Sequence, residues 1–160
     1  MNRTPPFPAG TRREALRLAL GLAAAPLLLT LRAGPASGTP EAMAAALRAF
    51  TGGAQPREGR VTLDLPPLVE NGNSVPVTVA VDSPMTPEAF VRRVAIFNEK
   101  NPQPNVAVFH LTPRSGRAGV NTRIRLADSQ RIVAIAETSD GAFWTASGDV
   151  IVTLAACIES

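Results

Sequence analysis

The sequence predicts an all-β domain, an immunoglobulin-like β-sandwich of about seven strands, preceded by a short N-terminal helix and a signal peptide. Apolar and polar residues alternate with a period of two in several short runs, which is the pattern of strands with one buried face. Turn-forming clusters separate these runs at short intervals. The 160-residue chain contains 15 Pro and 12 Gly, which favours many turns over long helices.

The clearest strand is predicted over residues 75–81, where every second residue is Val. Pro76 removes a backbone donor from it, so we expect this strand at a sheet edge or at a bulge. Residues 88–97 are ambiguous between strand and helix, because Thr86-Pro87-Glu88 is also a helix N-terminal signal. β-like runs are also found over residues 61–65, 91–97, 106–111, 120–126, 131–137 and 149–154.

The remaining boundaries follow from capping signals. Thr39-Pro40-Glu41 predicts the start of a short helix, since Thr is a good N-cap and Pro is tolerated at the first helical position. Gly52-Gly53 is typical of a helix end. Residues 39–59 are therefore predicted as a short helix and linker, residues 60–154 as the sandwich, and residues 155–160 as a C-terminal arm.

Residues 1–38 have the organisation of an export signal. Arg12 and Arg13 lie in a basic start, a fourteen-residue apolar run follows, and small residues come next. Such a run is too short to span a bilayer core of roughly 30 Å. The Thr before the arginine pair favours a twin-arginine signal, with Ala15 departing from the usual Phe and cleavage after residue 36. We therefore expect a periplasmic protein; a buried N-terminal helix with a chance arginine pair is the alternative.

The basic character of the chain belongs to this leader. Five of the sixteen Lys and Arg residues precede residue 39, against one of the thirteen Asp and Glu residues. The remainder therefore holds eleven basic and twelve acidic residues, and the chain has no Tyr and one Trp. A nearly neutral, aromatic-poor domain gives no support to nucleic-acid binding.

Cys157 is the only cysteine and lies beyond the last predicted strand. A lone, exported, exposed thiol is usually used chemically or linked to another chain, whereas a buried small hydrophobe is the structural alternative. His110 is the only histidine. A blue-copper site needs two histidines with its cysteine, so it is excluded by counting, and no metal site is predicted. A Cys157–His110 pair could activate the thiolate, but no glycine loop of the oxyanion-binding kind surrounds Cys157.

Four arginines follow one another across a predicted turn and strand. They could form a solvated sheet face, or a patch that faces an anion or a partner protein. They are Arg114, Arg117, Arg123 and Arg125.

Four stretches in order carry a family resemblance: NGNSVPVTVAVDSPMT, VAIFNEKNPQPNVAVFHLTP, TRIRLADSQRIVAIAETSDGAFW and DVIVTLAAC. Together they resemble SoxY, the sulfur-carrier subunit of the bacterial thiosulfate-oxidising Sox system, over roughly residues 40–157. The resemblance implies an immunoglobulin-like sandwich that pairs with a second small sandwich subunit, SoxZ. It also implies a Gly-Gly-Cys-Gly-Gly arm whose cysteine holds sulfur intermediates. A haem enzyme couples thiosulfate to that cysteine, a hydrolase removes sulfate, and further oxidation strips the remaining sulfur.

The residue that matches the carrier cysteine is Cys157. The resemblance thus implies a periplasmic carrier that is not an enzyme, needs no cofactor, has no membrane anchor after cleavage, and meets haem and hydrolytic Sox enzymes transiently. The arm departs from the family, because Ala155-Ala156 and Ile158-Glu159 replace the four glycines. Ala keeps a small size with less freedom, Ile158 adds bulk, and Glu159 adds a negative charge. The alternative is a diverged interaction module whose cysteine is incidental or forms an intermolecular disulfide.

The run Arg131–Glu137 (RIVAIAE) has apolar residues on both faces of its predicted strand. Burial on two faces exceeds what one sandwich core requires, so we expect a partner to cover the outer face. The SoxZ-like subunit is the partner that the resemblance implies.

Overall fold

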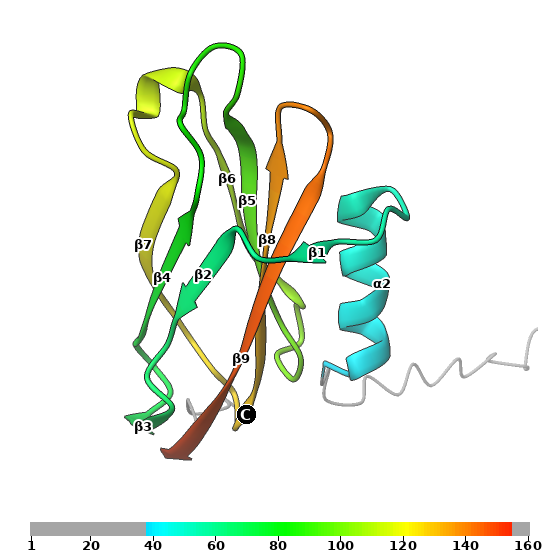
Figure 1. Cartoon of the computed structure of the whole chain (residues 1–160). Helices are drawn as coiled ribbons and strands as arrows, with labels where there is room; N and C mark the ends of the chain where they lie inside the picture. Colours follow the sequence, from blue (N-terminus) through cyan, green and yellow to red (C-terminus); the bar gives the residue numbers. More distant parts are fainter. Residues whose placement is uncertain (1–37, 155–160) are drawn as a thin grey trace, which may run out of the picture. The chain divides into compact units, whose positions relative to one another are not determined.

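The computed structural model describes residues 38–154, which form two β-sheets packed face to face and one helix beside them (Figure 1). The predicted all-β sandwich with a short preceding helix is confirmed. The predicted signal, with Arg12 and Arg13, and the predicted arm, with Cys157, lie outside the described residues.

The helix α2 covers Pro40–Thr51 and is capped as the sequence predicts. Thr39 has an extended backbone, and its hydroxyl accepts a hydrogen bond from the Ala42 N–H at 3.2 Å. Pro40 occupies the first helical turn, where its missing N–H costs nothing. Gly52 ends the helix with φ 63°, a left-handed conformation that glycine adopts without strain.

Nine strands make up the two sheets in the described part of the chain. The larger sheet has the order β1-β9-β8-β5-β6, with β3 pairing with β9 as well, and the smaller has the order β2-β4-β7. The strands are β1 (Arg57–Glu58), β2 (Val61–Asp64), β3 (Leu68–Asn71), β4 (Val75–Val81), β5 (Val91–Asn98), β6 (Asn105–His110), β7 (Gly119–Ile124), β8 (Gln130–Thr138) and β9 (Phe143–Leu154), and a short 3-10 helix, η1 (Pro113–Ser115), precedes β7.

The main core lies between the sheets and follows the predicted alternation. In β4 the side chains at positions 75, 77, 79 and 81 are buried, and those between them are exposed or half-buried. They pack against inward residues of β5 and β8, among them Val94, Ile96 and Ile132.

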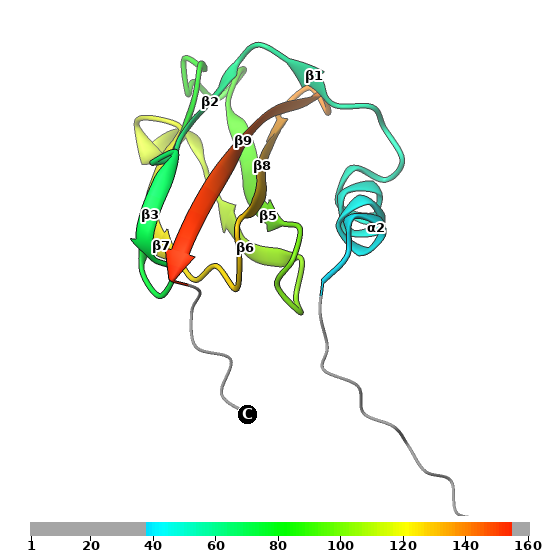
Figure 2. The same ribbon diagram turned by 90° about the horizontal axis from the view of Figure 1, so that it is seen from below.

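A second apolar cluster covers the outer face of β5 and β8, and the chain's own helix provides the cover. Phe97 and Ile135 in the sheet are buried beneath Met43, Leu47 and Phe50 of α2. Figure 2 shows α2 on the side of this sheet that faces away from β2 and β4. The two-sided burial of Arg131–Glu137 therefore needs no partner, and the inference from it to a partner-covered face was wrong.

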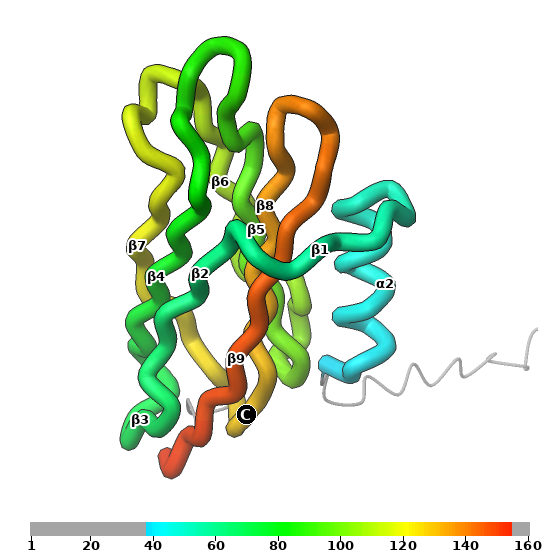
Figure 3. Tube along the Cα trace, in the orientation of Figure 1, coloured from blue at the N-terminus to red at the C-terminus, as the bar shows by residue number. Residues whose placement is uncertain are grey.

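Three features of the strands differ from the predictions. The short strands β1 and β3 were not predicted, and β9 begins at Phe143 instead of residue 149. β1 falls in the predicted linker, where the chain crosses β9 on its way from α2 to β2 (Figure 3). Both β1 and β3 pair with β9 in parallel, so their partners are distant in sequence and leave no local signal.

The ambiguous segment 88–97 resolves as a strand. The Thr86 hydroxyl accepts from the Ala89 N–H at 3.2 Å, which closes a turn, and β5 starts at Val91. The predicted edge position of the strand with Pro76 was wrong, because β4 is the middle strand of its sheet. Pro76 nevertheless lies two residues past the last β2–β4 pair, Asp64 with Thr78, so no donor is required there.

Candidate functional site: where the C-terminal arm leaves the sandwich

The strand β9 leads to the predicted site residue. Cys157 lies outside the described residues, and β9 is described up to Leu154. Three peptide units separate the two residues, so their Cα atoms are at most about 11 Å apart. The surface around residues 151–154 of β9, here called the arm root, is therefore the described surface from which the arm starts.

Strand β3 holds one side of the arm root. The Ile151 N–H donates to the Pro67 carbonyl, and the Gly72 N–H donates to the Leu154 carbonyl, both at 2.9 Å. The Thr153 hydroxyl lies within 3.3 Å of the Glu70 carbonyl and donates to it. A hydrogen-bonded ladder thus fixes the arm root up to Leu154, the last described residue.

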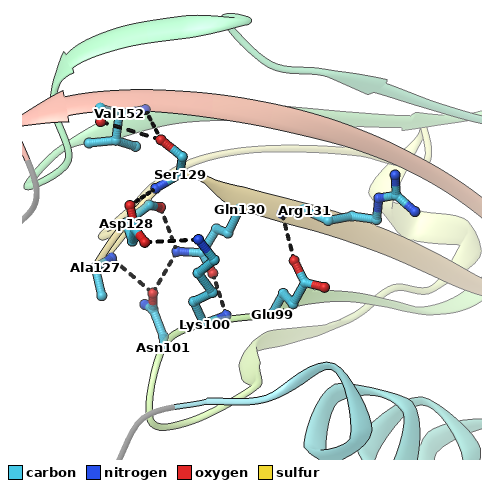
Figure 4. Close-up of polar contacts among 9 residues, drawn as sticks. All are labelled: Glu99, Lys100, Asn101, Ala127, Asp128, Ser129, Gln130, Arg131 and Val152. Atoms are coloured by element: carbon cyan, nitrogen blue, oxygen red, sulfur yellow. Dashed lines mark hydrogen bonds and ion pairs between the residues drawn. The ribbon is translucent and has the colours of Figure 1, made fainter.

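A serine in the turn before β8 holds the other side. The Val152 N–H donates to the Ser129 hydroxyl oxygen at 2.9 Å, and that hydroxyl lies 3.4 Å from the Val152 carbonyl (Figure 4). Ser129 takes the place of a strand partner here, because β8 pairs with β9 only as far as Gln130 with Val150. The turn at Asp128-Ser129 is visible in the sequence, but its contact with a strand 23 residues away is not.

A polar network behind Ser129 fixes this turn against the β5–β6 loop (Figure 4). Lys100 Nζ donates to Asp128 at 2.8 Å, and this contact, with the Ser129 N–H, lowers the pKa of Asp128 from its ordinary value. The buried Gln130 accepts from the Lys100 N–H and donates to Asn101 Oδ1 at 2.9 Å. Since the members satisfy one another, the network makes the arm root rigid.

The surface next to the network carries a further ion pair. Arg131 binds the carboxylate of Asp149 through two nitrogens, at 3.0 and 3.1 Å. The hydrogen bonds lower the pKa of Asp149 and raise that of Arg131. Both side chains are exposed, so the pair adds little to stability.

The four predicted arginines do not form one patch. Arg114 belongs to η1 and Arg117 follows it, at the end of β7 where Gly119 lies. Arg123 and Arg125 lie at the other end of β7, roughly 20 Å along for a strand of this length. That end adjoins the arm root through the Leu126 N–H, which donates to the Gly72 carbonyl at 2.8 Å.

His110 lies beyond the reach of the arm. It is exposed at the end of β6, three strands across from β9 and about 14 Å away by strand spacing. Along the strands, His110 pairs with Arg93 of β5, and the end of β5 nearer the arm root is at Asn98, five residues away. This places His110 about 17 Å further from the arm root. These spacings exceed the roughly 11 Å between Leu154 and the thiol, so a Cys157–His110 pair within one chain is disfavoured.

Residues 38–154 contain no group of three or more His, Cys, Asp or Glu side chains arranged to hold a metal ion. Among the helices of this part of the chain, none is long and apolar enough to cross a membrane.

Comparison with protein families gives a match over most of the chain. The family model described as "Sulfur oxidation protein SoxY" matches residues 47–157, a range that reaches Cys157. No curated protein sequence matches the chain.

Among solved structures, the sulfur carrier protein SoxY from Chlorobium limicola f thiosulfatophilum is 31% identical, with a TM-score of 0.58. The similarity covers 70% of this chain and 96% of that one. A putative superoxide reductase from Thermotoga maritima is 20% identical over 64% of this chain and 89% of its own, with a TM-score of 0.51. A superoxide reductase (neelaredoxin) from Ignicoccus hospitalis is 16% identical over 73% and 95%, with a TM-score of 0.53. At such low identities the two reductases share the fold alone.

Proposed function

The chain belongs to the SoxY family of sulfur oxidation proteins, and from this premise we propose that it is a periplasmic carrier that holds sulfur intermediates covalently on Cys157. The observation that carries the proposal is the family match, which extends through the only cysteine of the chain. The likeness to a solved sulfur carrier over 96% of that protein supports it.

The fixed arm root and the short arm suit this role. β3 and Ser129 hold β9 in place up to Leu154, and the thiol lies no more than about 11 Å further on. A thiol on such a tether can enter the active site of another protein while the sandwich stays outside. The chain supplies the nucleophile and its placement, and it is not itself an enzyme.

The loading step joins the Cys157 sulfur to the outer sulfur of thiosulfate. The thiolate and thiosulfate form a Cys–S–S–SO3⁻ group, and the two electrons released pass to the haem of the partner oxidase. In the unloading step a hydrolase adds water to this group, which yields sulfate, two protons and a persulfide, Cys–S–S⁻. The oxidant and the hydrolytic centre both belong to the partner enzymes.

A SoxZ-like subunit is proposed as the stable partner, giving a 1:1 heterodimer. Because α2 covers the outer face of β5 and β8, that subunit binds elsewhere on the sandwich. Co-expression of the mature chain with a SoxZ-like subunit is expected to yield a soluble complex. If the chain does not bind that subunit, the heterodimer is wrong and the carrier role is unaffected.

The carrier role is tested by loading. Thiosulfate alone should leave the mass of the native protein unchanged, and thiosulfate with the cognate haem enzyme should add one thiosulfonate group. Cys157→Ser should abolish the addition, whereas the matched variant Ala155→Ser, which keeps the thiol, should still be loaded.

Thiol labelling gives an independent test. A small thiol reagent should label native Cys157 completely, at a rate no greater than that of a model peptide. The proposal fails if the thiol resists labelling until the protein is denatured. A stable disulfide-linked dimer that no sulfur donor loads would favour the alternative, a diverged interaction module.

A further inference from the structure

The exposed large apolar side chains of the described residues lie on two paired strands, β3 and β9. They are Leu68 on β3 and Ile151 and Leu154 on β9, exposed by 54, 56 and 64%. Single exposed apolar residues need no explanation, but Leu68 and Ile151 are direct partners on neighbouring strands, and β9 leads on to the arm. Leu154 is the last described residue before the arm.

Leu68 and Ile151 form a fixed pair. They are partners in the parallel register of β3 and β9, so their side chains project from the same face of the ribbon. The next pair, Val69 with Val152, points the other way and packs on the main core. Hydrogen bonds to Pro67 and Ser129 hold the ribbon, so Leu68 and Ile151 cannot turn inward without breaking it.

The length of the arm determines what can cover this pair. An enzyme that acts on Cys157 must bring its reacting atoms to within about 11 Å of Leu154, plus the length of the cysteine side chain. Ile151 lies three residues before Leu154, roughly 10 Å back along the strand. The wall around the active-site entrance of such an enzyme therefore reaches the arm root and the pair beside it.

We propose that Leu68 and Ile151 are the docking patch for the enzymes that load and unload Cys157. The inference rests on the proposed carrier function and assigns the recognition surface of that same site. The partner it fits is an enzyme with apolar side chains around the entrance to its active site. The enzyme recognises the carrier by burying this patch in the contact. The polar groups beside it, Thr153 and Glu70, form the rim of the contact.

The test compares loading rates of the full mature chain and its variants. The double variant Leu68→Thr with Ile151→Thr removes the apolar surface and places β-branched residues, which suit strands, at both positions. Its control is Ala80→Thr, which introduces the same residue at an exposed position of β4 in the other sheet. With thiosulfate and the haem enzyme, the double variant should lose about tenfold in kcat/KM, mainly through KM, and the control should match the wild type. The labelling rate of Cys157 by a small reagent should be the same in all three proteins.

The outcomes separate this inference from the carrier role. Equal kcat/KM for the double variant and the wild type would overturn the docking patch and leave the carrier role intact. If the double variant instead loses its SoxZ-like subunit and is otherwise loaded normally, the patch is a subunit interface and the inference is wrong. If the wild type is not loaded at all, the carrier role fails and the docking patch fails with it.

Discussion

Phe50 is the residue that fixes α2 to the sheet, and its removal should be costly. Its ring centroid lies 5.8 Å from that of Phe97 and 6.1 Å from that of Phe143, both in edge-to-face geometry. The Arg93 guanidinium lies over the ring at 4.5 Å and forms an ion pair with Glu137. Phe50 thus joins the helix to β5 and β9 directly, and to β8 through the pair of Arg93 with Glu137.

The expected loss in Phe50→Ala follows from these contacts. Each edge-to-face pair contributes about 0.5–1.5 kcal/mol, and the cation–π contact adds about 0.5–1 kcal/mol. The ring is half-buried, so its transfer from water contributes about half of the 1.5–3 kcal/mol of a fully buried side chain. Together these terms predict that the free energy of unfolding falls by about 2–5 kcal/mol.

Urea denaturation of the mature chain measures this loss. Ala49→Ser, at an exposed position of α2, is the control and should change the free energy of unfolding by less than about 0.5 kcal/mol. The Phe50 variant should also self-associate, because loosening α2 uncovers Phe97 and Ile135. A loss below about 1 kcal/mol, with no self-association, would show that α2 does not cover the sheet in solution.

Three further predictions concern the signal, the arm root and the surface ion pair. Arg12→Lys with Arg13→Lys should leave the precursor in the cytoplasm, and normal periplasmic accumulation would remove the twin-arginine assignment. Ser129→Ala should cost about 1–2 kcal/mol and speed amide exchange at Val152, because that N–H loses its acceptor, whereas Ser147→Ala at an exposed site of β9 should cost little. The lowered pKa of Asp149 means that its pair with Arg131 stabilises the fold above the ordinary carboxyl pKa and is lost as pH falls through the lower folded-state value. NMR titration should therefore find the pKa of the Asp149 carboxyl below its ordinary value and moved back toward that value in Arg131→Ala, and an equal pKa in the two proteins would contradict the assigned pair.

The sequence predicts those parts of the fold that have local causes. The capping residues Thr39 and Gly52 define α2, and the alternating valines define β4, since both signals depend on near neighbours. Strand β3 has no such signal, because its pairing with β9 joins residues more than 80 positions apart. The two-sided run Arg131–Glu137 was correctly identified as buried, but the element that covers it, α2, lies far away in the sequence.

The residues of the candidate site likewise fall into those with a signal in the sequence and those without one. Cys157 could be identified because it is the only cysteine of the chain and lies in a C-terminal stretch that resembles the family. The family match extends to it. The arginines at 114–125 were grouped because they are close in sequence, yet β7 carries them to opposite ends of the sandwich. Ser129 could not be recognised, because its role depends on the folded position of Val152.

Intact-mass measurement of the protein purified from its own periplasm, during growth on thiosulfate, tests the central claim most directly. The carrier account predicts a population whose mass is raised by one or more sulfur atoms or by a thiosulfonate group, removable by a thiol reductant and located at Cys157 by peptide mapping. The Cys157→Ser protein from the same cells should show the unmodified mass alone. A wild-type protein that is uniformly unmodified, or that is found solely as a disulfide-linked dimer, would contradict the account.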